Sequence, residues 1–222
     1  MRRLILLRPE PGASESAARA AALGIDAVKL ALFDVVRVRW TVPDPAGFDA
    51  LLLTSANTIR HGGPGLERLR RLPVQAVGAA TAEAARAAGF SVAKVGGAGV
   101  DALLAGLPKG VRLLHLGGEE RTAPQAHGAH ITPVTIYRAA PLDLTAGALV
   151  VIEGAVVAVH SHRAGERLAE LMTDRASTTV VALSDEAASG LGARWQSIAV
   201  APRPSDAALL ALAAELCLVG GQ

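Results

Sequence analysis

Short apolar runs alternate along the chain with alanine-rich stretches that carry spaced charges. The runs do not alternate with polar residues, which is typical of strands covered on both faces of a parallel sheet. Six runs are interpreted as strands: 4–7, 26–33, 50–53, 74–77, 91–95 and 112–116. Because such strands alternate with helical stretches, the pattern predicts an α/β fold of the doubly wound type.

The helices are expected where small polar residues and glycines punctuate the pattern. Ser14 is predicted to cap a helix that runs to about residue 23, where Gly24 ends it. A helix after 54–57 is interrupted by glycines and resumes to residue 71. Two further helices are expected over 80–88 and 99–107.

The second half of the chain repeats the first at an offset of 106 residues. The offset carries Ser55 onto Ser161, 76–78 onto 182–184 and 103–104 onto 209–210, while 3–7 resembles 112–116 at an offset of 109. One interpretation is that all α/β units look alike in an alanine-rich chain. The sharper one is two similar α/β domains with a cleft between them, where small-molecule sites usually lie.

Two extended segments, 35–40 and 137–141, are candidates for connections between these domains. The first is followed by prolines and the second ends in one. We expect them to cross from one domain to the other side by side.

Composition excludes several functions. The 222 residues are 51% hydrophobic and 19% charged, so the chain can bury a core and is not a disordered linker. A net charge of +2 and an aromatic content of 3% argue against binding of nucleic acid. No apolar run is long enough for a membrane span or a signal peptide, so a cytoplasmic protein is expected. The lone cysteine, Cys217, is expected to be buried.

Motifs for nucleotides and metals are missing from the sequence. There is no P-loop, no Gly-x-Gly-x-x-Gly after a strand, and no CxxC or HExxH motif. His160 and His162 share a spacing that could hold a metal, but no carboxylate or cysteine stands near them at a suitable spacing. We therefore expect no metal and no organic cofactor.

What recurs instead is a strand followed by small, hydroxyl or amide residues that open a helix. The backbone N–H groups at such positions bind anions, and hydroxyls add donors. Ordinary helix capping is the alternative. The residues at these positions are Ser55, Asn57, Gly78, Thr81 and Ser161. Arg8, Arg121 and Arg138 could add charge-assisted bonds to a polyanionic ligand.

Tyr137 is the only tyrosine and lies at the end of the extended run 131–138. A phenol can donate a proton or a hydrogen bond to a departing oxygen. The alternative is a tyrosine that packs at a domain junction.

These residues, taken in order, resemble the uroporphyrinogen-III synthase family. The resemblance covers nearly the whole chain and is carried by 4–9, 48–57, 76–82, 118–121 and 134–138. It implies two parallel-sheet α/β domains joined by a two-stranded linker. One domain would comprise residues 1–34 plus 140–222, and the inserted domain residues 35–139.

The resemblance also implies a substrate, hydroxymethylbilane, a linear tetrapyrrole with eight carboxylates. The family expels its terminal hydroxyl and closes the ring with ring D inverted, without a cofactor. By this resemblance Tyr137 is the candidate catalytic residue. Arg8, Ser55, Asn57, Gly78, Thr81, Arg121 and Ser161 are the candidate substrate-binding residues. A monomer, and a transient handover of substrate from the preceding deaminase, complete the expectation.

The sequence departs from the family pattern in three places, and the first of these leaves an alternative open. Asp185 and Glu186 place negative charge at a helix start, and Ala187 stands where the family commonly has threonine. The segment 121–137 is short, and 149–152 reads as a strand where the family has a helix. The alternative is a catalytically inactive tetrapyrrole-binding or sensor protein of the same fold.

Overall fold

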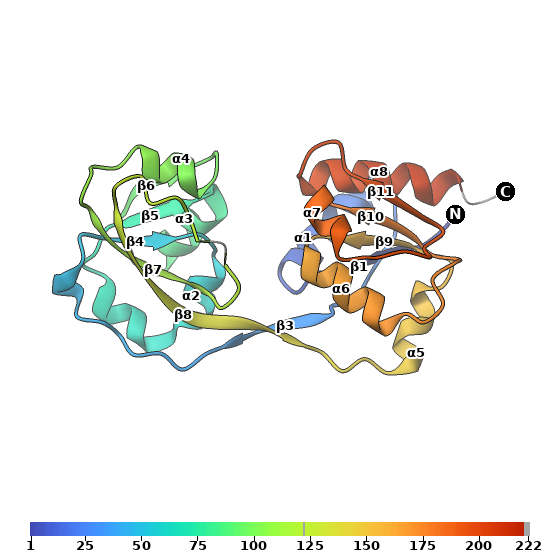
Figure 1. The fold of residues 1–222 in the computed structure, drawn as a ribbon, viewed down its shortest axis with the longest axis horizontal. Helices are drawn as coiled ribbons and strands as arrows, with labels where there is room; N and C mark the ends of the chain where they lie inside the picture. Colours follow the sequence, from blue (N-terminus) through green and yellow to red (C-terminus); the bar gives the residue numbers. More distant parts are fainter. Residues whose placement is uncertain (122, 220–222) are drawn as a thin grey trace. The chain divides into compact units, whose positions relative to one another are not determined.

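The computed structural model describes residues 1–121 and 123–219. The chain divides into two compact units, each described by itself below. Unit 1 comprises Met1–Asp34 and Pro141–Gln222, and unit 2 comprises Val35–Ala140. Unit 1 is blue and orange to red in Figure 1, and unit 2 runs from light blue to yellow. No helix in the described part of the chain is long and apolar enough to cross a membrane.

Unit 1 is built on a five-stranded sheet in the order β11-β10-β9-β1-β2, in which all neighbouring strands are parallel. Its strands are β1 (Leu4–Leu6), β2 (Ala27–Lys29), β9 (Val156–Val159), β10 (Thr179–Ala182) and β11 (Ser197–Val200). Its helices are α1 (Gly12–Ala22), α5 (Ala146–Leu149), α6 (His162–Leu171), α7 (Asp185–Ser189) and α8 (Asp206–Val219), with a 3-10 turn over Val150–Ile152.

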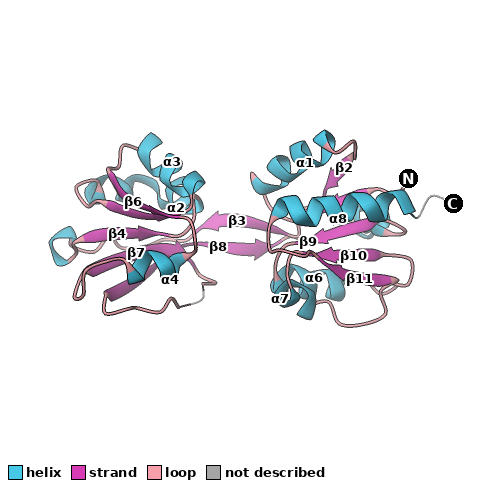
Figure 2. Cartoon of the chain, turned by 90° about the horizontal axis from the view of Figure 1, so that it is seen from above, coloured by secondary structure: helices cyan, strands magenta, loops and turns pink. Residues whose placement is uncertain are grey.

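Helices cover both faces of this sheet, which explains its uninterrupted apolar strands. α1 and α8 pack on one face, and α6 and α7 lie on the other (Figure 2). Leu4 and Leu6 of β1 are fully buried in the cluster under α8, where Cys217 also packs. The prediction of a buried Cys217 is confirmed.

Unit 2 contains a six-stranded sheet in the order β3-β8-β7-β4-β5-β6. Its strands are β3 (Phe33–Arg37), β4 (Ala50–Leu53), β5 (Val74–Val77), β6 (Val92–Gly96), β7 (Arg112–Gly118) and β8 (His130–Pro141). Its helices are α2 (Asn57–Gly62), α3 (Ala79–Ala87) and α4 (Val100–Ala105), with 3-10 turns over Pro45–Gly47 and Gly63–Leu69. α2 and α3 lie on one face of the sheet and α4 on the other (Figure 2).

β3 and β8 are neighbours in the sheet, and each crosses the chain position at which one unit gives way to the other. The predicted extended segments 35–40 and 137–141 overlap these two strands. The α/β fold class with parallel sheets is thus confirmed.

The repeat of 106 residues relates corresponding elements of the two units. It carries β4 onto β9 and the first residue of α4, Val100, onto the first residue of α8, Asp206. Strand register agrees, since Leu113 of β7 pairs with Ala50 as Leu4 of β1 pairs with Val156. β7 and β1 are therefore equivalent at an offset of 109.

Two local predictions need correction, and at a third place the structure agrees with the family resemblance rather than with the apolar pattern. The single strand expected over 26–33 is two strands, β2 and β3, because the chain follows β1 only to Leu32 and then leaves it. Ser14 does not cap α1. The helix begins at Gly12, after the N-cap residue Pro11, and the Glu10 carboxylate accepts from the Ser14 N–H at 3.0 Å. Residues 149–152, which read as a strand, are helical as the family resemblance implied.

Candidate functional site

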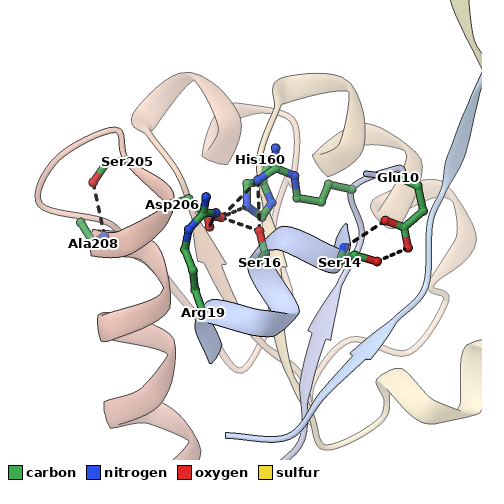
Figure 3. A network of polar contacts seen from close by, with 9 residues as sticks. Glu10, Ser14, Ser16, Arg19, His160, Ser205, Asp206 and Ala208 are labelled. Atoms are coloured by element: carbon green, nitrogen blue, oxygen red, sulfur yellow. Dashed lines mark hydrogen bonds and ion pairs between the residues drawn. The ribbon is translucent and has the colours of Figure 1, made fainter. Parts of the chain in front are cut away.

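A polar network in unit 1 centres on the Asp206 carboxylate at the start of α8 (Figure 3). Its Oδ1 atom accepts from the Ser16 hydroxyl at 2.8 Å and lies 2.9 Å from Nε2 of His160. Nη1 of Arg8 donates to the same oxygen at 3.2 Å, and Nη1 of Arg19 donates to Oδ2 at 2.6 Å. One carboxylate therefore joins the ends of β1 and β9 to α1 and α8.

Burial and hydrogen bonding set the charges in this network. Burial raises the pKa of Asp206, but hydrogen bonds from His160, Ser16 and Arg19 outweigh it and lower the pKa overall. Burial lowers the pKa of His160, and the bond to Asp206 offsets this only in part. The other ring nitrogen of His160, Nδ1, is buried and has no partner in the described chain. Neutral His160 thus donates from Nε2 to an ionised Asp206.

Arg8, a predicted binding residue, is held by this network. Its guanidinium lies over Gly12, where an added Cβ would come within 2.6 Å of Nη2 and 2.7 Å of Cζ. Nη1 also bonds the Ser16 hydroxyl at 3.1 Å. The side chain is 29% exposed, so Arg8 is already partnered but still reaches solvent.

The corresponding end of the sheet in unit 2 carries a second group of polar residues. His115 of β7 is 2% exposed, and its Nε2 lies 3.3 Å from Oγ1 of Thr54. Burial, and then the charge of Arg121, lower the pKa of His115 to about 4. Nη1 of Arg121 donates to the Gly118 carbonyl and, at 3.1 Å, to the Thr135 hydroxyl. His115 is therefore neutral beside a fixed cation.

These residues line a cavity of about 300 Å³. Its lining consists of Thr54, Val77, Val100, His115, Glu120, Arg121 and Pro124. Glu120 is exposed to solvent, whereas Arg121 is half-buried. A second cavity of similar size shares His115, Arg121 and Pro124 with it.

Tyr137, the predicted catalytic residue, lies on β8 opposite Gly118. Its backbone carbonyl accepts from the Glu119 N–H at 2.9 Å. Its ring lies 5.9 Å from the ring of His61, centroid to centroid. Within the described residues its hydroxyl makes no hydrogen bond, so the group is free to bind a ligand.

The predicted helix-start residues are partly engaged in capping. Ser55 accepts from the Asn57 N–H at 3.2 Å, and the Asn57 side chain accepts from Arg60 at 3.0 Å. Ser161 caps α6 by accepting from the Ala164 N–H at 3.2 Å. The hydroxyls of Ser55 and Ser161 can still donate, so capping does not exclude ligand contact.

Gly78 and Thr81 belong to the start of α3. Gly78 has a φ of +85°, which favours glycine, and an added Cβ would meet no atom within 4 Å. Thr81 is only 5% exposed, so most of its side chain packs against unit 2.

The predicted residues fall in both units. Unit 1 holds Arg8 and Ser161, and unit 2 holds Ser55, Asn57, Gly78, Thr81, Arg121 and Tyr137. Sequence reasoning missed Thr54, His115, Ser16 and Asp206. The repeat held a signal for two of them. At the offset of 106 residues Thr54 aligns with another polar residue, His160, whereas Asp206 aligns with the apolar Val100 and so marks a difference between the two units.

The chain is similar to one protein family and to solved structures of known proteins. A model described as "Uroporphyrinogen-III synthase HemD" matches residues 14–211. A uroporphyrinogen-III synthetase structure from Helicobacter pylori is 20% identical, covering 97% of this chain and 100% of its own, with a TM-score of 0.70. A mutant uroporphyrinogen III synthase from Thermus thermophilus is 18% identical over 99% of each chain, with a TM-score of 0.52. No curated protein matches the sequence significantly. The solved structures share the fold, and since the family model spans most of the sequence, the chain belongs to the uroporphyrinogen-III synthase family.

Proposed function

We propose that this chain is a uroporphyrinogen-III synthase, a lyase that converts hydroxymethylbilane to uroporphyrinogen III with loss of water and inversion of ring D. The observation that carries the proposal is the family match over residues 14–211. No metal or organic cofactor takes part.

The substrate's carboxylates call for cations and N–H donors. Arg121 offers a guanidinium with no carboxylate partner in the described chain, and Arg8 offers an exposed edge beyond its bonds to Asp206 and Ser16. Charge-assisted bonds of this kind are roughly twice as strong as neutral ones. Arg8, Ser55, Asn57, Gly78, Thr81, Arg121 and Ser161 are the residues proposed to bind the substrate.

Tyr137 is proposed to assist departure of the terminal hydroxyl. Its O–H would give a proton to the leaving oxygen as the C–O bond breaks, so that water departs, and the pyrrole N–H of the same ring would return a proton to the phenolate as the azafulvene forms. The substituted carbon of ring D would then attack the azafulvene. The enzyme must then hold the tetrapyrrole in the crowded geometry that gives the spiro intermediate, because the free chain closes to the type I isomer. The unpartnered Tyr137 hydroxyl supports this role.

Free hydroxymethylbilane cyclises on its own to the type I isomer. The type III product is therefore favoured when the substrate spends little time free in water. We propose that the chain acts as a cytoplasmic monomer and receives its substrate by transient handover from the deaminase that makes it. A ratio of type III to type I product that rises when the deaminase is present at the same concentration as this chain would support the handover. A ratio that is independent of deaminase concentration would contradict it.

A tetrapyrrole-binding protein without turnover is the second candidate. Asp185 and Glu186 are exposed in the first turn of α7, where they would repel a carboxylate ligand. This candidate predicts binding of uroporphyrin without formation of the type III isomer.

The test is a product assay. Hydroxymethylbilane is generated enzymatically in place, the purified chain is added, and the oxidised uroporphyrins are separated by isomer. A dominant type III peak is expected, and Tyr137→Phe should lower its rate of formation about 10- to 100-fold. Type I alone from the folded protein would reject synthase activity in favour of the second candidate.

A further inference from the structure

The two units differ at one equivalent position in a way that bears on ligand binding. The repeat places Val100 of unit 2 where unit 1 has Asp206, each as the first residue of its helix. In unit 1 the Asp206 carboxylate neutralises Arg8 at 3.2 Å. In unit 2 the equivalent side chain, that of Val100, carries no charge.

Unit 2 nevertheless keeps a cation at this place. By strand register Arg8 corresponds to Gly117, which has no side chain. Arg121 approaches this vacated position, since its Cδ lies 3.6 Å from where a Cβ of Gly117 would be. A different residue therefore supplies the guanidinium that Arg8 supplies in unit 1.

The residues around Arg121 in unit 2 can also be compared with their equivalents in unit 1. Thr54 stands at the position of His160, and its hydroxyl contacts neutral His115 on β7. Thr54, His115, Val100 and Arg121 all line the cavity of about 300 Å³. No carboxylate in the described chain lies within ion-pair distance of Arg121. Glu120 also lines the cavity, but its side chain is exposed and forms no ion pair with Arg121, so the guanidinium remains available to a ligand.

We propose that this cavity in unit 2 binds one carboxylate-bearing side arm of the tetrapyrrole, whose carboxylate takes the place that Asp206 takes in unit 1. Arg121 would bind it by a charge-assisted bond, the Thr54 hydroxyl would donate to it, and Val100 would pack against the methylene groups of the arm. The inference rests on the proposed function and adds to it a defined subsite.

The test fills the cavity with an internal carboxylate. Val100→Asp recreates the arrangement of unit 1, and its carboxylate should pair with Arg121. Val100→Asn introduces a side chain of nearly the same shape as aspartate that carries no charge. Binding of uroporphyrin III is measured by fluorescence titration, with circular dichroism to verify folding. Val100→Asp should weaken binding at least about tenfold and Val100→Asn by no more than about threefold, because only the former competes electrostatically.

A second variant keeps the test decisive if Val100→Asp fails to fold. Arg121→Gln removes the cation from the cavity, and it should weaken uroporphyrin III binding by about tenfold and flatten its salt dependence. Equal effects of Val100→Asp and Val100→Asn, or wild-type affinity in Arg121→Gln, would overturn the subsite.

The product assay separates this proposal from the proposed function. Type III formation by the wild-type chain, with equal affinities for the two Val100 variants, would reject the subsite alone. Type I alone, with binding that Val100→Asp weakens and Val100→Asn does not, would reject the synthase activity and support the subsite. A wild-type chain that neither binds uroporphyrin nor forms type III would reject both.

Discussion

Oδ1 of Asp206 lies 2.9 Å from Nε2 of His160, and the two residues join the start of α8 to the end of β9. The pair is largely buried, with 12% of the His160 side chain and 16% of the Asp206 side chain exposed. Because two arginines and a serine also donate to this carboxylate, Asp206 holds four donors from three separate parts of the chain.

Replacing Asp206 by asparagine should therefore destabilise the protein. The asparagine side chain would keep the shape but lose the charge that Arg8 and Arg19 require, and its NH2 group would replace one accepting oxygen and face a donor. The expected loss is about 2 kcal/mol in the free energy of unfolding, measured by urea denaturation at pH 7.

A matched control is Glu67→Gln, which removes a carboxylate from an exposed ion pair with Arg70. Exposed pairs contribute little, so this variant should unfold with the wild-type midpoint. If Asp206→Asn did the same, the network in unit 1 would have no stabilising role.

His115 should make stability depend on pH. Its pKa is about 4 in the folded chain and about 6.5 when unfolded, because burial and then Arg121 disfavour its cation. The unfolded state thus binds more protons between pH 6.5 and 4, and stability falls as the pH drops through this window.

Replacing His115 with leucine, the residue that unit 1 has at the equivalent position, removes this dependence. Urea titrations of both proteins should show the variant gaining about 3 kcal/mol on the wild type between pH 7 and pH 4. The comparison cancels the contributions of His160 and the carboxylates. Parallel stability curves would show that His115 accepts a proton as readily folded as unfolded.

The sequence predicted the framework of each unit well. Apolar runs such as 50–53 favour strands that are covered on both faces, and the structure contains the predicted strands 50–53 and 74–77 as β4 and β5. The repeat of 106 residues correctly paired strands and helices of the two units. Such signals are local or periodic, so they can be read without knowing the fold.

The Asp206 network could not be read in this way. Its members stand at positions 8, 16, 19, 160 and 206, and only the fold brings them together. Ser14 was misjudged for a similar reason, since the helix begins two residues earlier, at Gly12, and Glu10 accepts from the Ser14 N–H group. Arg8 and Arg121 could be predicted as cations. The packing shows that, of these two, Arg8 pairs with a carboxylate of the described chain and Arg121 does not.

The contact between α6 and α7 offers a test of packing in unit 1. An added Cβ at Gly190 would lie 3.0 Å from the Glu166 backbone nitrogen and closer still to the His162 carbonyl, and neither atom can move without shifting α6. Gly190→Ala should lower the free energy of unfolding by about 2 kcal/mol or more. Gly97→Ala, whose Cβ would meet no atom within 4 Å, should leave it unchanged within error. Equal stabilities would mean that the helices separate at little cost.

Gly118 and Tyr137 provide a test of how the tyrosine is positioned. A Cβ at Gly118 would lie 2.7 Å from Cε2 and 3.1 Å from Cζ of the Tyr137 ring, so Gly118→Ala must displace the ring. At Gly117, by contrast, the Cβ would make ordinary contacts at 3.4 Å or more. Gly118→Ala should lower the kcat for type III formation about tenfold, and Gly117→Ala by less than about threefold.

A double variant decides whether this loss passes through the Tyr137 hydroxyl. If displacing the ring acts only by misplacing that group, then adding Gly118→Ala to Tyr137→Phe should cost little further rate, because the hydroxyl is already gone. Independent losses that multiply in the double variant would instead assign Gly118 a separate role, such as backbone contact with the substrate. Circular dichroism and unfolding of all four proteins would separate either result from a general loss of structure.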